Sequence, residues 1–205
     1  MRRVLISVRG IPGSGKTYIA DKIGDTIRCI DTDDIVSDAY DALARASKGA
    51  KFTVDEVIER AQRSLDEVCL ELGPGVTVVV GTTLTVASAN TRLFVSMSQR
   101  TLRVAYERAI RREVAKYATI SARAVGRLSA DRIPPYLACK LHVNAFDPRR
   151  EFSEYAEMYA SAFEFERNNG ARMMSQQEIV SYVRRLEARL RRHSGLEKGV
   201  QMRRS

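Results

Sequence analysis

The stretch "GIPGSGKT", residues 10–17, decides the fold, because it matches the pattern G-x-x-x-x-G-K-[ST] without a gap. A short apolar run over residues 4–8 precedes it, and a predicted helix from Thr17 to about Gly24 follows it. Glycines let backbone N–H groups turn inward, and a helix N-terminus attracts anions, so the segment predicts a phosphate-binding loop. The candidate nucleotide-binding residues are Gly10, Ile11, Pro12, Gly13, Ser14, Gly15, Lys16 and Thr17.

Two side chains of this loop have expected roles of their own. The Lys16 ammonium would reach the β- and γ-phosphates of a nucleoside triphosphate, and the Thr17 hydroxyl would ligate Mg²⁺. The expected cofactors are therefore ATP and Mg²⁺. An ordinary glycine-rich turn is the alternative, but it gives no reason for the complete pattern.

Strand-like and helix-like segments alternate along the chain, which predicts an α/β fold with a parallel sheet covered on both faces. We expect a three-layer P-loop NTPase sandwich with an arginine-rich helical lid, formed as one domain by residues 1–193, with a flexible basic tail over 194–205. A helix over 85–100 would bury Leu93, Phe94 and Met97. The predicted strands are 4–8, 26–30, 76–81 and 102–106, and the other predicted helices are 54–72, one from about 111, one within 133–170 and one from 175.

Three acids follow the second predicted strand in "CIDTDD", residues 29–34. Ligands of open α/β sheets lie beyond the carboxyl ends of the strands, so Asp31, Asp33 and Asp34 are suitably placed. One of them could accept the proton of an attacking hydroxyl group during phosphoryl transfer. Capping of the next helix explains one residue, Asp31 or Thr32, but does not explain all three acids.

The chain carries a net charge of +9, and the charge is concentrated in two segments. Residues 100–127 and residues 184–205 each hold eight basic and two acidic side chains, +6 apiece, which leaves −3 for the remainder. Such localisation indicates a polyanionic partner such as nucleic acid, although a solvated basic tail is the plainer alternative.

Composition argues against several other classes of protein. No apolar run is long enough to span a bilayer, so no membrane partner is expected. Cys29, Cys69 and Cys139 form no C-x-x-C pair and fit small buried thiols in a reducing, cytoplasmic compartment. His142 and His193 lack the spacing of metal ligands.

The order of these motifs resembles the kinase domain of polynucleotide 5′-hydroxyl kinases and their relatives, which include tRNA-acting and small-molecule kinases. The resemblance covers residues 1–165 and rests on the glycine loop, "CIDTDD", the helix 54–72, "VVVGTTLT" and "RAVGRLSADRIPPYLACKL". It implies that Asp33 is the general base, with Asp34 beside it. Shikimate-kinase-like enzymes, with D-x-D after strand two, imply the same residue.

The resemblance also implies two lid arginines, Arg123 and Arg127, ahead of the pair Ile133-Pro134. Lid arginines neutralise charge on the transferring phosphoryl group. In a segment this rich in arginine, the pair is preferred only somewhat over Arg108, Arg111 or Arg112.

The chain departs from the family at two places. Thr32 stands where the family has an arginine, and Val80-Gly81 stand where it has an acid at the end of strand three. The second change removes a water-mediated anchor for Mg²⁺, and Asp31 on the neighbouring strand is the expected substitute. The candidate metal-binding residues are therefore Thr17 and Asp31.

Three functions follow from these patterns. The first is a kinase that moves the γ-phosphoryl of ATP to a polynucleotide 5′-hydroxyl, with residues 100–127 contacting the acceptor's phosphates. The second is a kinase for a nucleotide or small metabolite. The third is a non-catalytic nucleotide-binding protein, which the missing acid at Gly81 would suit.

Overall fold

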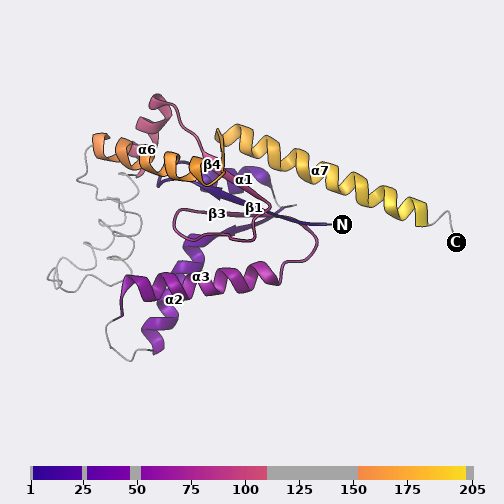
Figure 1. Ribbon diagram of the computed structural model, residues 1–205, viewed down its shortest axis with the longest axis horizontal. Coiled ribbons are helices and arrows are strands. Elements are labelled where there is room, and N and C mark those ends of the chain that lie inside the picture. The colour runs from indigo at the N-terminus through magenta and orange to yellow at the C-terminus, as the bar shows by residue number, and fades with distance from the viewer. Residues whose placement is uncertain (1, 25–26, 47–51, 110–151, 202–205) are drawn as a thin grey trace.

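The structure is a computed structural model, and it describes residues 2–24, 27–46, 52–109 and 152–201. These residues include the five strands and six helices named here (Figure 1). A helix over residues 99–109 is one of them. The others, in chain order, are β1 (Arg3–Arg9), α1 (Lys16–Ile23), β2 (Arg28–Asp31), α2 (Thr32–Ala46), α3 (Val54–Leu70), β3 (Gly75–Gly81), β4 (Thr91–Val95), α6 (Phe152–Asn168), β5 (Arg172–Met174) and α7 (Gln176–Gln201).

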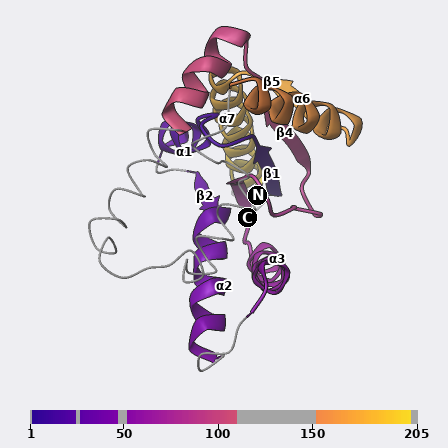
Figure 2. The same cartoon turned by 90° about the vertical axis from the view of Figure 1, so that its left-hand side faces the viewer.

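The strands form one parallel sheet in the order β2-β3-β1-β4-β5. Alternate residues of the central strand β1 face opposite sides, because Leu5 packs with α2 and α3 while Ile6 and Val8 pack with α1 and α7. Figures 1 and 2 show the same two helical layers on either side of the sheet. The predicted three-layer α/β fold is confirmed, and its parallel strands bring their carboxyl ends to one edge.

Two capping boxes fix where helices begin, as the sequence predicted. At α3, Thr53 N donates to Glu56 Oε2 at 2.6 Å and Glu56 N donates to Thr53 Oγ1 at 3.2 Å. At α7, Ser175 N donates to Glu178 Oε2 at 2.7 Å. The second box places Gln176 in the first turn of α7, beside the glycine loop.

Two predicted elements between residues 85 and 106 are wrong. Residues 91–95 form the strand β4 and not part of a helix, although Leu93 and Phe94 are buried as expected. Asn90 fixes this strand, because its N–H donates to Leu5 O and its Oδ1 accepts from Leu5 N, both at 2.8 Å. The predicted strand 102–106 lies in the helix 99–109, whose buried residues Leu102, Ala105 and Ala109 follow helical spacing.

The C-terminal part of the chain differs from expectation at one further place. No predicted element corresponds to β5, a three-residue strand at the sheet edge. The α7 backbone is helical to Gln201, and the flexibility expected of residues 194–205 stays a prediction. The predicted lid and the basic helix from Arg111 lie outside the described residues. Within those residues, no helix is both long and apolar enough to cross a bilayer.

Candidate nucleotide-binding site

The glycine loop is enclosed by packing on both sides. Gly13 and Gly15 adopt left-handed backbones, with φ of 79° and 83°. A Cβ at Gly13 would overlap the carbonyl oxygen of Ala105, and one at Gly15 would overlap the side-chain amide of Gln176. The loop therefore fits between the helix 99–109 and the start of α7 only because these positions have no side chain.

Hydrogen bonds from distant elements hold the loop backbone. Gln176 Nε2 donates to Ser14 O at 2.7 Å, and the fully buried Tyr155 of α6 donates its hydroxyl hydrogen to Pro12 O. Within the loop, Ser14 N donates to Ile11 O at 3.1 Å. These bonds pre-form the loop, so ligand binding need not order it.

The side chains of the loop suit an anionic ligand. Lys16 Nζ donates to Gly10 O at 2.7 Å and to Ile11 O at 3.1 Å, which holds the ammonium at the loop. Ser14 Oγ is buried and has no hydrogen-bond partner among the described residues. An orphaned hydroxyl beside left-handed glycines and a lysine is the donor set that phosphate oxygens need.

A cavity of about 180 Å³ at the carboxyl edge of the sheet brings together the four predicted catalytic and metal-binding side chains that the structure describes. Lys16 and Thr17 line it from the loop and α1, and Asp31 and Asp33 line it from the end of β2 and the start of α2. Asp34 is not among its lining residues. The structure therefore shows the proximity that the sequence predicted, while the roles of the four residues stay predictions.

The Asp31 carboxylate has two contacts, one with the backbone of α2 and one with the cavity. Its Oδ1 accepts from Asp33 N at 3.0 Å, which is the expected cap of α2, and its carboxylate also lines the cavity. Burial is the main cause that raises its pKa above the usual value, and the carboxylates of Asp33 and Asp34 add to it. A nearby cation would therefore relieve a carboxylate that the fold has partly desolvated.

The donors suit Mg²⁺, which takes one or two carboxylates and completes its shell with water and substrate phosphates. The Thr17 hydroxyl and the Asp31 carboxylate are such oxygens. In the part of the chain that the structure describes, no group of three or more His, Cys, Asp or Glu residues could hold a metal by itself. Any Mg²⁺ bound here would therefore complete its shell with water or with the phosphates of a nucleotide.

The two departures from the kinase pattern meet in space. Thr32 is 2% exposed and its side chain lies against Gly81, where a Cβ would overlap its hydroxyl and methyl groups. An acid at position 81 is therefore sterically incompatible with Thr32. The residues at positions 32 and 81 are therefore sterically linked.

Gly81→Ala is expected to destabilise the fold by about 1–3 kcal/mol, the usual cost of overpacking. Thr32→Ala in the same chain should recover part of the loss, because it removes the hydroxyl and methyl groups that the new Cβ would approach most closely and leaves only the Thr32 Cβ, at 2.9 Å. Urea unfolding of the four members of this double-mutant cycle measures the coupling. Additive effects would show that the two positions do not touch.

Thr82 is fixed at the cavity by a chain of polar contacts. Arg9 Nη2 donates to Thr82 O at 2.6 Å, and Arg9 Nη1 pairs with the buried Glu166 of α6 at 2.5 Å. Thr82 Oγ1 in turn donates to Gly10 O at 3.1 Å. The end of β3 is thereby tied to the first glycine of the loop.

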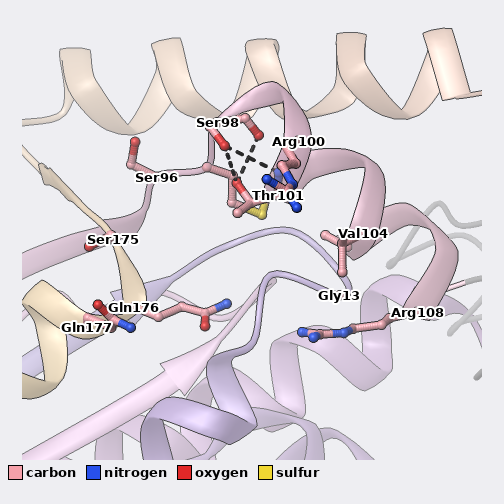
Figure 3. A pocket seen from close by; sticks show the side chains of 12 residues that line it. Gly13, Ser96, Ser98, Arg100, Thr101, Val104, Arg108, Ser175, Gln176 and Gln177 are labelled. Atoms are coloured by element: carbon pink, nitrogen blue, oxygen red, sulfur yellow. Dashed lines mark hydrogen bonds between the residues drawn. The ribbon is translucent and has the colours of Figure 1, made fainter.

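A larger cavity, about 450 Å³, opens on the other side of Gly13 (Figure 3). Met97, Val104 and Ala105 line it with apolar atoms, and Gln176 and Ser98 add polar groups. Its size falls in the range of small-molecule sites. Figure 3 shows Gln176 and Arg108 reaching toward one another from opposite sides of it.

Arg108 is the arginine that the described structure places at the site, since it lines both cavities. The preferred candidates, Arg123 and Arg127, lie outside the described residues, so their placement is untested. The helix 99–109 brings Arg108 to the loop, a position that the predicted strand 102–106 did not indicate. Arg108 was one of the alternatives to that pair, whereas Thr82 and Gln176 were missed, and no local pattern indicates them.

Cys29 is exposed, which corrects the expectation of buried thiols; Cys69 is buried, and Cys139 lies outside the described residues. Partial desolvation and then the Asp31 charge raise the pKa of the Cys29 thiol to about 11.

With Cys69 and Cys139 replaced by serine, we expect alkylation of Cys29 at pH 8 to be roughly 10²-fold slower than for free cysteine, because the thiolate fraction is small. Asp31→Asn should speed it, and an unchanged pH profile would contradict the predicted Asp31 influence.

No family model matches the chain, and no curated protein matches it. Among solved structures it is similar to TT1252 from Thermus thermophilus, with 17% identity, coverage of 94% of this chain and 98% of that chain, and a TM-score of 0.45. It is also similar to APE1195, with 17% identity, coverage of 80% and 96%, and a TM-score of 0.37. A sugar kinase from Janibacter sp. HTCC2649 shows 18% identity, coverage of 79% and 95%, and a TM-score of 0.33. Similarity at this level assigns neither a family nor an activity.

Proposed function

We propose that the protein is an ATP-dependent phosphotransferase that moves the γ-phosphoryl group of ATP to a hydroxyl acceptor. The observation that carries this proposal is the single cavity in which the Lys16 ammonium, the Thr17 hydroxyl and the carboxylates of Asp31 and Asp33 meet. Phosphoryl transfer needs these parts: cations on the phosphates, oxygen ligands for Mg²⁺ and a base for the acceptor.

Each residue has a distinct part in the proposed reaction. The acceptor oxygen forms a bond to the γ-phosphorus, the bond from that phosphorus to the β,γ-bridging oxygen breaks, and ADP leaves. Asp33, an exposed carboxylate on the cavity wall, takes the acceptor's proton. Lys16 neutralises charge on the phosphates. Mg²⁺, when bound by Thr17 and Asp31, supplies further charge neutralisation on the phosphate oxygens.

The larger cavity is assigned to the nucleoside of ATP. It shares Gly13 and Arg108 with the phosphate cavity, so a nucleotide can place its phosphates in one and its base in the other. Apolar side chains such as Met97 and Val104 suit the face of a base, and the Gln176 amide can hydrogen-bond to its edge. Arg108 stands where the two parts join and serves as a phosphate-binding cation.

A polynucleotide 5′-hydroxyl is the first candidate acceptor. It rests on the motif order of residues 1–165 and on the basic segment 100–127, which offers contacts to phosphodiesters. A small metabolite is the second candidate, and one observation favours it. The exposed face of α2 beside the cavity carries Asp33, Asp34, Asp38 and Asp41, whose charges repel a polyanion.

Label transfer from γ-labelled ATP tests these assignments. The acceptors are 5′-hydroxyl oligonucleotides of DNA and RNA, then mononucleotides, then neutral polyols. Label on oligonucleotides supports the first acceptor, and label only on small acceptors supports the second. ATP binding without transfer to any acceptor would overturn the proposed activity in favour of a non-catalytic nucleotide-binding protein.

A further inference from the structure

Four exposed arginines gather on one side of α7, the side that faces β5. They are Arg172 of β5 and Arg185, Arg189 and Arg192 of α7, and we call them the arginine flank. Arg172 joins the set because its guanidinium carbon lies 5.0 Å from the ring centroid of Tyr182, one turn before Arg185. None of the four pairs with an acid among the residues that the structure describes.

Two other arginines of α7, each next in sequence to a member of the flank, behave differently. Arg184 donates to Lys22 O at the end of α1, and Arg191 pairs with Glu187 at 2.6 Å. Arg184 therefore links α7 to α1, and Arg191 pairs with an acid of its own helix. By contrast, Arg185 donates Nε to Ser181 O of its own helix, at 3.2 Å, and no acid among the described residues pairs with it. The acid Glu178 at the start of the same side is engaged with Ser175 in the capping box.

Helical spacing turns the flank into a line of charge. Positions 185, 189 and 192 follow the i, i+4, i+7 pattern, so neighbouring Cβ atoms are about 5–6 Å apart on one face. Arginine presents a planar fork of donors that matches phosphate oxygens. A row of such forks is complementary to a chain of phosphates, while a single small anion would engage only one or two of them.

The flank is separate from the phosphate-transfer cavity. Gln176 contacts the loop, and at 1.5 Å per residue Arg185 and Arg192 lie about 14 and 24 Å further along the α7 axis. Figure 1 shows α7 leading away from the sheet. The flank borders β5, whereas Asp31 and Asp33 follow β2, at the opposite edge of the sheet.

We propose that the arginine flank binds the phosphodiester backbone of nucleic acid and anchors it away from the reaction site. An anionic membrane is a poorer match. On the apolar side of α7, Ile179 and Val183 are fully buried in the core, so these side chains are not available to insert into a bilayer. This binding needs no phosphoryl transfer, so it stands or falls independently of the proposed activity.

The test compares the full chain with a triple variant, Arg185→Gln, Arg189→Gln and Arg192→Gln. The matched control is Arg45→Gln, Arg60→Gln and Arg63→Gln, three exposed arginines of α2 and α3 with the same loss of charge. The probe is a fluorescent 20-nucleotide DNA that already carries a 5′-phosphate, so it offers no 5′-hydroxyl to phosphorylate. Anisotropy titrations from 50 to 200 mM salt give the affinity and its salt slope, and circular dichroism confirms that both variants are folded.

The flank variant should bind at least roughly tenfold more weakly at 0.1 M salt. Its slope of log affinity against log salt should be smaller by about 2, at roughly 0.7 for each lost contact to a single strand. The control should change little. Equal losses in both variants would show that only the net charge of the protein matters, and this would overturn the proposal. Unchanged binding by the flank variant would also overturn it. So would binding to anionic vesicles, lost in the flank variant, without binding to the oligonucleotide.

Discussion

Lys16→Ala is expected to lower phosphoryl transfer by roughly 10²–10³-fold or more, the cost of losing one preorganised donor to developing charge. Lys16 Nζ is held at the loop by Gly10 O and Ile11 O, so it needs no large movement to reach a phosphate. Its replacement leaves the apolar core unchanged, because its partners are loop carbonyls. Single-turnover transfer from γ-labelled ATP to the best acceptor measures the loss.

Lys22→Ala is the matched control, since Lys22 is an exposed lysine on the same helix whose ammonium lies 5.7 Å from the Tyr18 ring centroid. It should transfer phosphate at nearly the normal rate. Thermal unfolding of both variants should stay close to that of the wild type, which separates chemistry from stability. Near-normal turnover of Lys16→Ala would overturn the assignment of the loop as the triphosphate site.

The sequence predicted those parts of the site whose residues lie close together in the chain. Residues 10–17 contain the loop, its lysine and its hydroxyl within eight positions, and the strand and helix beside it are set by neighbouring residues. Asp31 and Asp33 could be placed because parallel strands bring their carboxyl ends to one edge, even though β3 lies between β2 and the strand β1 that leads into the loop. The capping boxes could be predicted because each is formed by two residues three positions apart in the chain.

The parts that were missed depend on contacts between residues far apart in the chain. Residues 85–100 allow a helix by their apolar spacing, but Asn90 pairs with Leu5, 85 positions away, and the sheet decides the outcome. Gln176 meets Ser14 across 162 positions, and a glutamine after a capping serine gives no hint of that contact. Arg108 could not be singled out among neighbouring arginines until its helix was recognised.

Asp33→Asn is expected to lower turnover on the order of 10²–10⁴-fold, the usual size of general-base catalysis. The amide keeps the size and polarity of the side chain but cannot take a proton at neutral pH. ATP affinity should stay close to normal, because the loop and Lys16 carry it. Transfer measured at saturating ATP and Mg²⁺ isolates the chemical step, and Asp34→Asn is the matched control, since Asp34 does not line the cavity.

Asp31→Asn distinguishes a metal role from a capping role. Asparagine caps a helix about as well as aspartate, so a capping role alone predicts almost no change in stability or turnover. A metal role predicts a higher Mg²⁺ requirement, because one of the few protein oxygens for the ion becomes neutral. Titrating Mg²⁺ against single-turnover transfer separates these outcomes. If Asp33→Asn were as fast as wild type while Asp31→Asn was inactive, the assignment of Asp33 as the base would be wrong. If all three variants stayed active, the acidic run would be only the start of α2, and the base would lie elsewhere.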